Sequence, residues 1–277
     1  VVLASDGNGG TDTQAVAVTV TALNDNAPVI TSNGGGAAAA VTVAENTTAI
    51  TVVSAADADL PAQTLTYSIA GGADAALFMV DASTGALSFI AAPDCEVPAD
   101  AGANNVYDVV VQVSDGSLTD TQALAISVTP VNDNAPVITS NGGGATAAIA
   151  VGENSTAVTA VAAIDADVPA QTLTYSIAGG ADSALFTINS STGALSFIAA
   201  PDFEVPTDAG ANNIYDVVVQ VSDGSLNDTQ AVAVTITNVN DNAPVITSNG
   251  GGATAAVAIG ETGSAVTTVT ATDADLP

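Results

Sequence analysis

The feature that most constrains the fold is a long internal repeat. The string NDNAPVITSNGGG begins at Asn24, again at Asn132 and again at Asn240, so its two intervals are equal (132 − 24 and 240 − 132). The repeat is therefore 108 residues long (132 − 24). This is the size of one independent domain, whereas the turn of a solenoid is far shorter. The sequence therefore predicts a tandem array of domains, each with its own core.

The period divides the chain into four segments. Residues 27–134 and residues 135–242 are complete repeats. Residues 1–26 match only the last part of a repeat, and residues 243–277 match only its beginning. Both end pieces lack the stretch equivalent to roughly 170–220, so together they cannot make one domain. The simplest interpretation is a window from a longer polypeptide.

Within a repeat the pattern is that of β-strands separated by turns. Short runs rich in Val, Ile, Thr, Leu and Tyr are interrupted by Gly, Pro, Asn and Asp. Such short antiparallel strands predict an all-β fold, a seven-stranded Greek-key sandwich of the immunoglobulin-like type. The alanine-rich pieces are too short to form a helix. The strands predicted in the first complete repeat are 41–43, 50–56, 65–70, 78–80, 87–90, 106–114 and 121–131, preceded by a short segment at 29–30.

The charge balance excludes several kinds of partner. The chain has 29 acidic residues and no Lys, Arg or His, for a net charge of −29. Nucleic acid is excluded because phosphate binding depends on basic side chains, and anionic membrane surfaces are disfavoured for the same reason. No apolar run reaches the ~18–20 residues that span a bilayer, so we expect no membrane insertion within this segment. The single Cys95 is expected to fill an apolar core position, with a free reactive thiol as the alternative.

The acids recur in a few motifs that fall in loops or at strand ends. With no cationic side chain in the sequence, no salt bridge can neutralise them. Unit charges about 4 Å apart repel by about 4 kcal/mol near a protein surface. Calcium suits such a cluster because it takes six to eight oxygen ligands, whereas zinc and copper favour His or paired Cys. The motif acids are Asp6, Asp115 and Asp223 (SDG); Glu45, Glu153 and Glu261 (EN or ET); Asp57/Asp59, Asp165/Asp167 and Asp273/Asp275 (DAD); Asp94/Glu96 and Asp202/Glu204 (PDxE); and Asp25, Asp133 and Asp241 (NDN).

Other polar and aromatic residues have simpler interpretations. Tyr67, Tyr175, Phe89 and Phe197 recur at strand positions typical of a core. The remaining acids are expected to be solvated surface charge; they include Asp12, Asp74, Asp81, Asp108, Asp120 and Asp182. Four Asn-X-Ser/Thr sequons are read as chance matches in a chain rich in Asn and Thr; they begin at Asn46, Asn154, Asn189 and Asn227.

The motifs NDNAP, EN, DAD, PDFE and SDG, in this order and at a fixed period, resemble the calcium motifs of cadherin repeats along all 277 residues. The resemblance implies calcium at the junction between consecutive repeats, with ligands from the upstream repeat, the linker and the downstream repeat. For the central junction it implies Glu45, Asp94, Glu96, Asn132, Asp133, Asn134, Asp165, Asp167 and Asp223. For the C-terminal junction it implies Glu153, Asp202, Glu204, Asn240, Asp241, Asn242, Asp273 and Asp275. For the N-terminal junction it implies Asn24, Asp25, Asn26, Asp57, Asp59 and Asp115.

The linkers depart from the family pattern in one respect. The family linker usually opens with an Asp two residues before NDN, where this chain has Ala22, Pro130 and Asn238. One carboxylate is therefore missing from each junction. We expect two or three Ca²⁺ ions per complete junction, with the upstream site the most altered.

These observations predict a calcium-stiffened array that forms the stalk of a secreted or cell-surface protein. Its expected partners are calcium and the neighbouring repeats of the same chain. The near-identical repeats and scarce cysteine resemble large bacterial surface adhesins more than animal junction cadherins. Two alternatives stay open, a self-assembling filament in which like chains bundle, and a directly adhesive module with homophilic or ligand binding. An enzyme is not expected, because the acids recur in every repeat without His, Lys or Arg to complement them.

Overall fold

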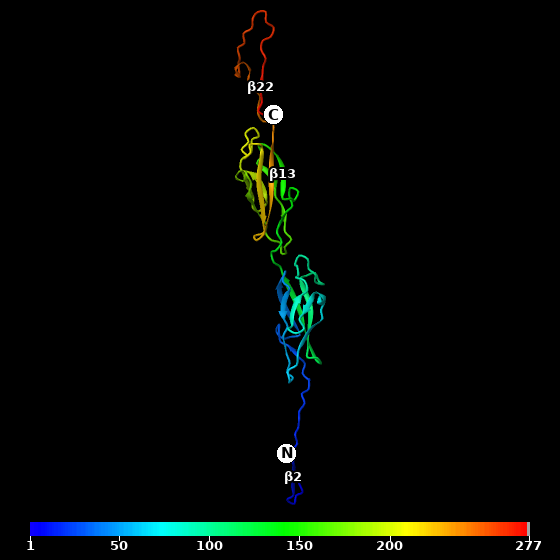
Figure 1. The fold of residues 1–277 in the computed structure, drawn as a ribbon. Helices are drawn as coiled ribbons and strands as arrows, with labels where there is room; N and C mark the ends of the chain where they lie inside the picture. The colour runs from blue at the N-terminus through cyan, green and yellow to red at the C-terminus, as the bar shows by residue number, and fades with distance from the viewer. Residues whose placement is uncertain (276–277) are drawn as a thin grey trace. The chain divides into compact units, whose positions relative to one another are not determined.

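The structure, a computed structural model, describes residues 1–275. The chain divides after Val131 into two compact units, each of which holds one β-sandwich (Figure 1). The repeat boundaries predicted after residues 26, 134 and 242 stay a prediction. Among the described residues, no helix is long and apolar enough to cross a membrane. The regular elements are strands and short 3₁₀ turns, so the predicted all-β class is confirmed.

The sandwich of the first unit has two main sheets and a short strand pair. One sheet has the order β4-β11-β10-β7, the other has the order β5-β9-β8, and β3 pairs with β6. A 3₁₀ turn at Ala75–Leu77 precedes β8. The strands are β3 (Val29–Ile30), β4 (Ala38–Ala44), β5 (Ala49–Val52), β6 (Ala55–Ala56), β7 (Thr66–Gly71), β8 (Phe78–Val80), β9 (Ala86–Phe89), β10 (Val106–Ser114) and β11 (Thr119–Thr129).

The second unit repeats this arrangement. Its sheets have the orders β13-β20-β19-β16 and β14-β18-β17, and β12 pairs with β15. The strands are β12 (Val137–Ile138), β13 (Thr146–Gly152), β14 (Ala157–Ala160), β15 (Ala163–Ile164), β16 (Thr174–Gly179), β17 (Phe186–Ile188), β18 (Ala194–Phe197), β19 (Ile214–Ser222) and β20 (Asn227–Thr237), with a 3₁₀ turn at Ser183–Leu185. The end pieces add the hairpin of β1 (Val2–Ser5) and β2 (Thr11–Gln14), and the pair of β21 (Val245–Ile246) and β22 (Ala271–Thr272) with a 3₁₀ turn at Ser248–Gly250.

One strand pairing differs from the prediction of antiparallel strands. β4 runs parallel to β11, with Ala38 opposite Ala123 and Ala44 opposite Thr129, and β13 pairs with β20 in the same way. A hairpin turn would force two consecutive strands to be antiparallel, but these partners are separated by most of the domain. The intervening chain visits the other sheet before it returns, and the first long strand can therefore join the last one in parallel.

Each core is built on aromatic side chains that face inward from both sheets. The Phe78 and Phe89 rings stack at 4.8 Å, and Tyr107 lies edge-on to Phe89 at 5.1 Å. β10 alternates buried and partly exposed positions, as a strand with one face on a core must. Phe197 is buried like Phe89, and Tyr67 and Tyr175 pack against their cores. The predicted packing role of these four aromatic residues is confirmed.

Cys95 lies in the core of the first unit with 5% of its surface exposed, as predicted. Burial, together with the nearby Glu45 carboxylate, raises the pKa of its thiol to about 11. In a chelating buffer at pH 8, we expect alkylation by iodoacetamide to be about 100-fold slower in the folded chain than in denaturant, because the thiolate is the nucleophile. The folded rate should rise steeply as the pH approaches 11. Equal rates at pH 8 in the two states would contradict this placement.

Four of the acids assigned to the surface are buried instead: Asp74, Asp100, Asp182 and Asp208. Asp74 and Asp182 are each 5% exposed, so the prediction of solvated charge is wrong for them. Asp74 Oδ1 accepts the N–H of Ala101 at 2.7 Å, and its Oδ2 accepts the N–H of Asp108 at 2.8 Å. Asp182 accepts the N–H groups of Ala209 and Asp216 in the same geometry. Backbone donors replace water at these carboxylates, which makes their burial tolerable.

Candidate metal centre

Three acids converge at the start of the second unit. Asp165 and Asp167 follow directly after β15, and Asp223 begins the turn between β19 and β20. A carboxylate oxygen from each lies within 4.8 Å of the other two. Asp167 is 4% exposed, and the other two side chains are half-buried. The structure thus brings together the DAD and SDG acids that sequence motifs had placed in one ligand set.

Each half-buried carboxylate in this cluster uses one oxygen for the backbone and leaves the other without a partner. Asp223 Oδ1 accepts the N–H groups of Ser225 at 2.6 Å and Leu226 at 2.7 Å. Asp165 Oδ1 accepts the N–H of Asp167 at 3.0 Å. Asp223 Oδ2, Asp165 Oδ2 and Asn132 Oδ1 are buried and have no hydrogen-bond partner within the described residues. Buried oxygens without donors are costly, and a bound cation would satisfy all three.

The linker amides hold the deepest acid of the cluster. Asn134 donates to Asp167 Oδ1 through its backbone N–H at 3.2 Å and through its side chain at 2.9 Å. Gln171 Nε2 donates to Asp167 Oδ2 at 3.2 Å. Burial works against ionisation of Asp167, but these hydrogen bonds outweigh it and hold its pKa below the usual value. Backbone donors from Leu226 and Ser225 likewise outweigh burial and lower the pKa of Asp223. Asp167 and Asp223 are therefore charged at neutral pH.

Gln171 was not among the residues predicted for this site. It accepts a hydrogen bond from Asn132 Nδ2 at 3.0 Å in addition to its bond to Asp167. Its counterpart in the first unit, one period earlier, is Gln63, whose Oε1 is buried without a partner in the described structure. The signal available in the sequence was this recurrence at the same place after the DAD motifs of the two complete repeats.

The first unit repeats the arrangement with its own linker. Asp59 Oδ2 accepts the N–H groups of Asp25 and Asn26, both at 3.1 Å. In the amide orientation that suits its neighbours, Asn24 donates to Asp115 at 3.1 Å and to Asp59 at 3.3 Å. Asp57 Oδ2 is buried without a partner in the part of the chain that the structure describes. Hydrogen bonds within this unit thus join Asn24, Asp25, Asn26, Asp59 and Asp115 of the predicted N-terminal set.

A second group of acids lies at the far end of the second sandwich. Glu153, Asp202 and Glu204 each offer an oxygen within 4.8 Å of the others. Glu153 follows β13 and is 5% exposed. Its Oε1 accepts the N–H of Val239 and its Oε2 accepts the N–H of Phe203, both at 2.7 Å. One buried carboxylate therefore joins the linker to the loop that carries Asp202 and Glu204.

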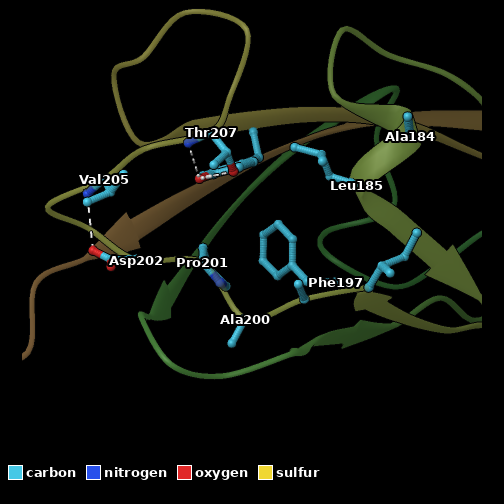
Figure 2. A pocket seen from close by; sticks show the side chains of 11 residues that line it. Ala184, Leu185, Phe197, Ala200, Pro201, Asp202, Val205 and Thr207 are labelled. Atoms are coloured by element: carbon cyan, nitrogen blue, oxygen red, sulfur yellow. Dashed lines mark hydrogen bonds between the residues drawn. The ribbon is translucent and has the colours of Figure 1, made fainter.

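That loop is positioned by hydrogen bonds over a hollow. Asp202 Oδ1 accepts the N–H of Glu204 at 3.0 Å and the N–H of Val205 at 3.1 Å, the second of which is drawn in Figure 2. The Tyr215 hydroxyl accepts the N–H of Thr207 at 3.1 Å. Beneath lies an apolar cavity of about 340 Å³, whose walls include Leu185, Phe197, Pro201, Val205 and Tyr215. The equivalent cavity of the first unit measures about 200 Å³. Hydrogen bonds thus position Asp202 at the wall of this cavity.

The linker that leaves β20 brings further acids to Glu204. Glu204, Asp241 and Asp275 offer oxygens within 4.8 Å of one another. Burial and the neighbouring carboxylates of Glu153, Asp275 and Asp202 raise the pKa of Glu204. Asn242 donates to Asp275 from its backbone N–H and from its side chain, both at 2.8 Å. Of the C-terminal set, Asp273 Oδ1 accepts the N–H of Asp275 at 3.1 Å, while Asn240 is exposed.

The predicted central set is divided between the two units. Glu45, Asp94 and Glu96 lie in the first unit, and its other members lie in the second. Glu45 Oε2 accepts the N–H of Cys95 and Oε1 accepts the N–H of Val131, both at 2.6 Å. Asp94 Oδ1 accepts the N–H of Glu96 at 2.9 Å, and Asp133 accepts a bond from Asn134 at 3.0 Å. Of the other motif acids, Asp6 caps its own exposed turn and Glu261 is exposed.

Comparison with known proteins shows a similarity to cadherins. Residues 147–239 match the cadherin domain family. Human protocadherin Fat 1 is 32% identical over 293 aligned positions, which cover 100% of this chain and 6% of that protein. Rabbit (Oryctolagus cuniculus) cadherin-16 is 35% identical over 167 positions, covering 55% of this chain and 19% of that protein. The chain thus spans a small part of the curated relatives that it matches.

Solved structures agree on the fold. Protocadherin gamma B2 extracellular cadherin domains 3–6 are 26% identical with a TM-score of 0.56, over 79% of this chain and 53% of that one. Mouse cadherin-23 EC22–24 has a TM-score of 0.65 at 22% identity, over 91% of this chain and 80% of that one, and shows the shared fold alone. Residues 147–239 match a cadherin domain, and the chain has the tandem cadherin-like β-sandwich fold of these structures.

Proposed function

We propose that this chain is a calcium-stiffened part of an extracellular adhesion protein, in which the junctions between repeats bind the ions. The observation that carries the proposal is the set of buried oxygens without partners on Asp165, Asp223 and Asn132. They belong to a chain with no Lys, Arg or His to satisfy them. Cadherin domains bind calcium at the junctions between consecutive domains, and this all-oxygen donor set suits calcium.

The residues proposed as ligands are those that the motifs predicted. Asn132, Asp133, Asn134, Asp165, Asp167 and Asp223 would act with Glu45, Asp94 and Glu96 at the central junction. Glu153, Asp202, Glu204, Asn240, Asp241, Asn242, Asp273 and Asp275 would act at the C-terminal junction, and Asn24, Asp25, Asn26, Asp57, Asp59 and Asp115 at the N-terminal one. Two or three ions per complete junction remain our proposal. Bound calcium would replace repulsion of about 4 kcal/mol per close pair by attraction and fix the linker.

The site suits a compartment with millimolar calcium. Extracellular calcium modules bind at about 10⁻⁴ to 10⁻³ M, so a junction of this kind is loaded outside cells. Human, rabbit and mouse adhesion proteins are among the relatives. The resemblance to bacterial adhesins, by contrast, stays a prediction. The stalk role rests on repeats so alike that no single one is specialised; aggregation of beads coated with the isolated array would show direct adhesion instead.

Calcium titration of thermal unfolding tests the proposal. At a free calcium concentration 100-fold above Kd, each site should add about 2.7 kcal/mol to the free energy of unfolding. Asp223→Ala should remove much of this gain in the second unit. Asp216→Ala is the matched control, since Asp216 lies exposed on the preceding strand. Small-angle scattering should show a stiffer chain with calcium than with chelator. Identical melting and scattering in the two buffers would refute the proposal.

A further inference from the structure

The linkers of the three repeats differ at the position two residues before NDN, and in the third linker the structure shows a contact there that the motifs do not predict. Asn238 directly follows β20. Its Nδ2 donates to Glu204 Oε1 at 2.9 Å and to the backbone carbonyl of Asp275 at 3.1 Å. Both partners can only accept, so the orientation of the amide is settled by its surroundings. One side chain thus joins the acidic loop of the repeat, the linker and the end of the next DAD motif.

We propose that the Asn238 amide is a positioning residue that ties this linker to both neighbours without a cation. The inference rests on the proposed function, because it concerns what holds the junction when calcium is absent. Glu204 faces Asp241 and Asp275 with oxygens within 4.8 Å. A neutral amide donor placed among carboxylates supplies part of the attraction that an ion would supply, and adds no charge.

Neighbouring amides extend the same network. Asn154 Nδ2 donates to Asp241 Oδ2 at 2.5 Å. Asn242 Nδ2 donates to Asp241 Oδ1 and Asp275 Oδ1, both at 2.8 Å, and more weakly to Glu204 Oε2 at 3.4 Å. Asn238 differs from them because its place in the other linkers is taken by residues that cannot do the same. Ala22 has no side-chain donor, and Pro130 has neither a side-chain donor nor an N–H.

It follows that the linkers of the array differ in how far they depend on calcium. In a chelating buffer the linker at 238–242 keeps the hydrogen bonds of the Asn238 amide to Glu204 and Asp275, whereas the linkers that begin at Ala22 and Pro130 lack this donor. A stalk built in this way would have junctions that loosen at different calcium concentrations, with the one at Asn238 the last to loosen.

Amide hydrogen exchange on the whole chain, followed by NMR, tests the tie. The reporter is the N–H of Asn242, which donates to Asp275 Oδ2 at 2.8 Å. In chelator, Asn238→Ala should lower its protection about fivefold, the effect of losing one modest hydrogen bond. The same variant should change little in saturating calcium. Asn227→Ala, at an exposed position on β20 outside every proposed ligand set, is the matched control and should leave protection unchanged in chelator.

The Asn238→Asp variant tests whether Asn238 acts as a hydrogen-bond donor to the surrounding carboxylates or only fills space in the linker. It keeps the size of the side chain, removes the donor and adds a carboxylate beside Glu204. Protection of the Asn242 N–H should fall in chelator by more than with Asn238→Ala, while calcium affinity should rise about tenfold through the added ligand.

Wild-type protection of the Asn242 N–H in the Asn238→Ala variant in chelator would refute the proposed role of Asn238. Loss of this protection in both chelator and calcium with Asn238→Asp would refute it as well. If calcium changes neither the melting nor the scattering of the wild-type chain, the proposed function is refuted. The comparison of wild type with Asn238→Ala in chelator would still test the Asn238 contact.

Discussion

Replacing Glu153 by Ala is expected to lower the free energy of unfolding of the second unit by about 3 to 5 kcal/mol, even in chelator. The side chain is 5% exposed and its two oxygens accept the N–H groups of Val239 and Phe203 at 2.7 Å. A hydrogen bond to a charged group contributes about 1.5 to 3 kcal/mol, and the variant leaves two donors unsatisfied. Glu153 would thus be a structural tie as well as a calcium ligand.

The experiment is a denaturant melt of the second unit in chelator and in calcium. Glu261→Ala is the matched control, since Glu261 occupies the equivalent motif position but is exposed, and its effect should stay within about 0.5 kcal/mol. Glu153→Gln should also destabilise the unit, because its amide nitrogen would face an N–H donor. A Glu153→Ala variant that is normal in chelator and weak only in calcium would show a ligand with no structural role.

The period and the motifs together predicted which acids meet at the start of each unit. Asp165 and Asp167 are far from Asp223 in the sequence, yet the three converge because each follows a strand that ends at the same edge of the sandwich. Their recurrence at the period of the repeat marked them as a set. Strand positions were also predictable, since alternation of apolar residues depends on local sequence alone.

Long-range pairing and the partners of individual acids were not predictable in the same way. β4 lies beside β11 in parallel because of the path of the whole chain, and no local pattern encodes that direction. Asp74 and Asp81 look alike in the sequence, as acids between strands. Only the fold brings the N–H groups of Ala101 and Asp108 to Asp74, whereas Asp81 stays exposed in its turn. Sequence shows charge but not the donors that face it.

Asp182 is the counterpart of Asp74 in the second unit and is likewise held by backbone N–H groups. Replacing Asp182 by Ala is expected to lower the free energy of unfolding of the second unit by about 3 kcal/mol. Its Oδ1 accepts the N–H of Ala209 at 2.7 Å and its Oδ2 accepts the N–H of Asp216 at 2.8 Å, so the variant buries two unsatisfied donors. These bonds hold the loop at 208–213 against the start of β19.

Chemical denaturation with and without calcium checks this prediction. The loss should be the same in both buffers, because Asp182 is not among the proposed ligands. Asp216→Ala removes an exposed carboxylate while keeping the backbone N–H that Asp182 accepts, and it should change stability by less than about 0.5 kcal/mol. A loss confined to the calcium buffer would instead place Asp182 in the ion network. An equal loss in both buffers would show that buried acids in this chain have two separable roles. Some, such as Asp182, accept hydrogen bonds from backbone N–H groups, and others would bind calcium.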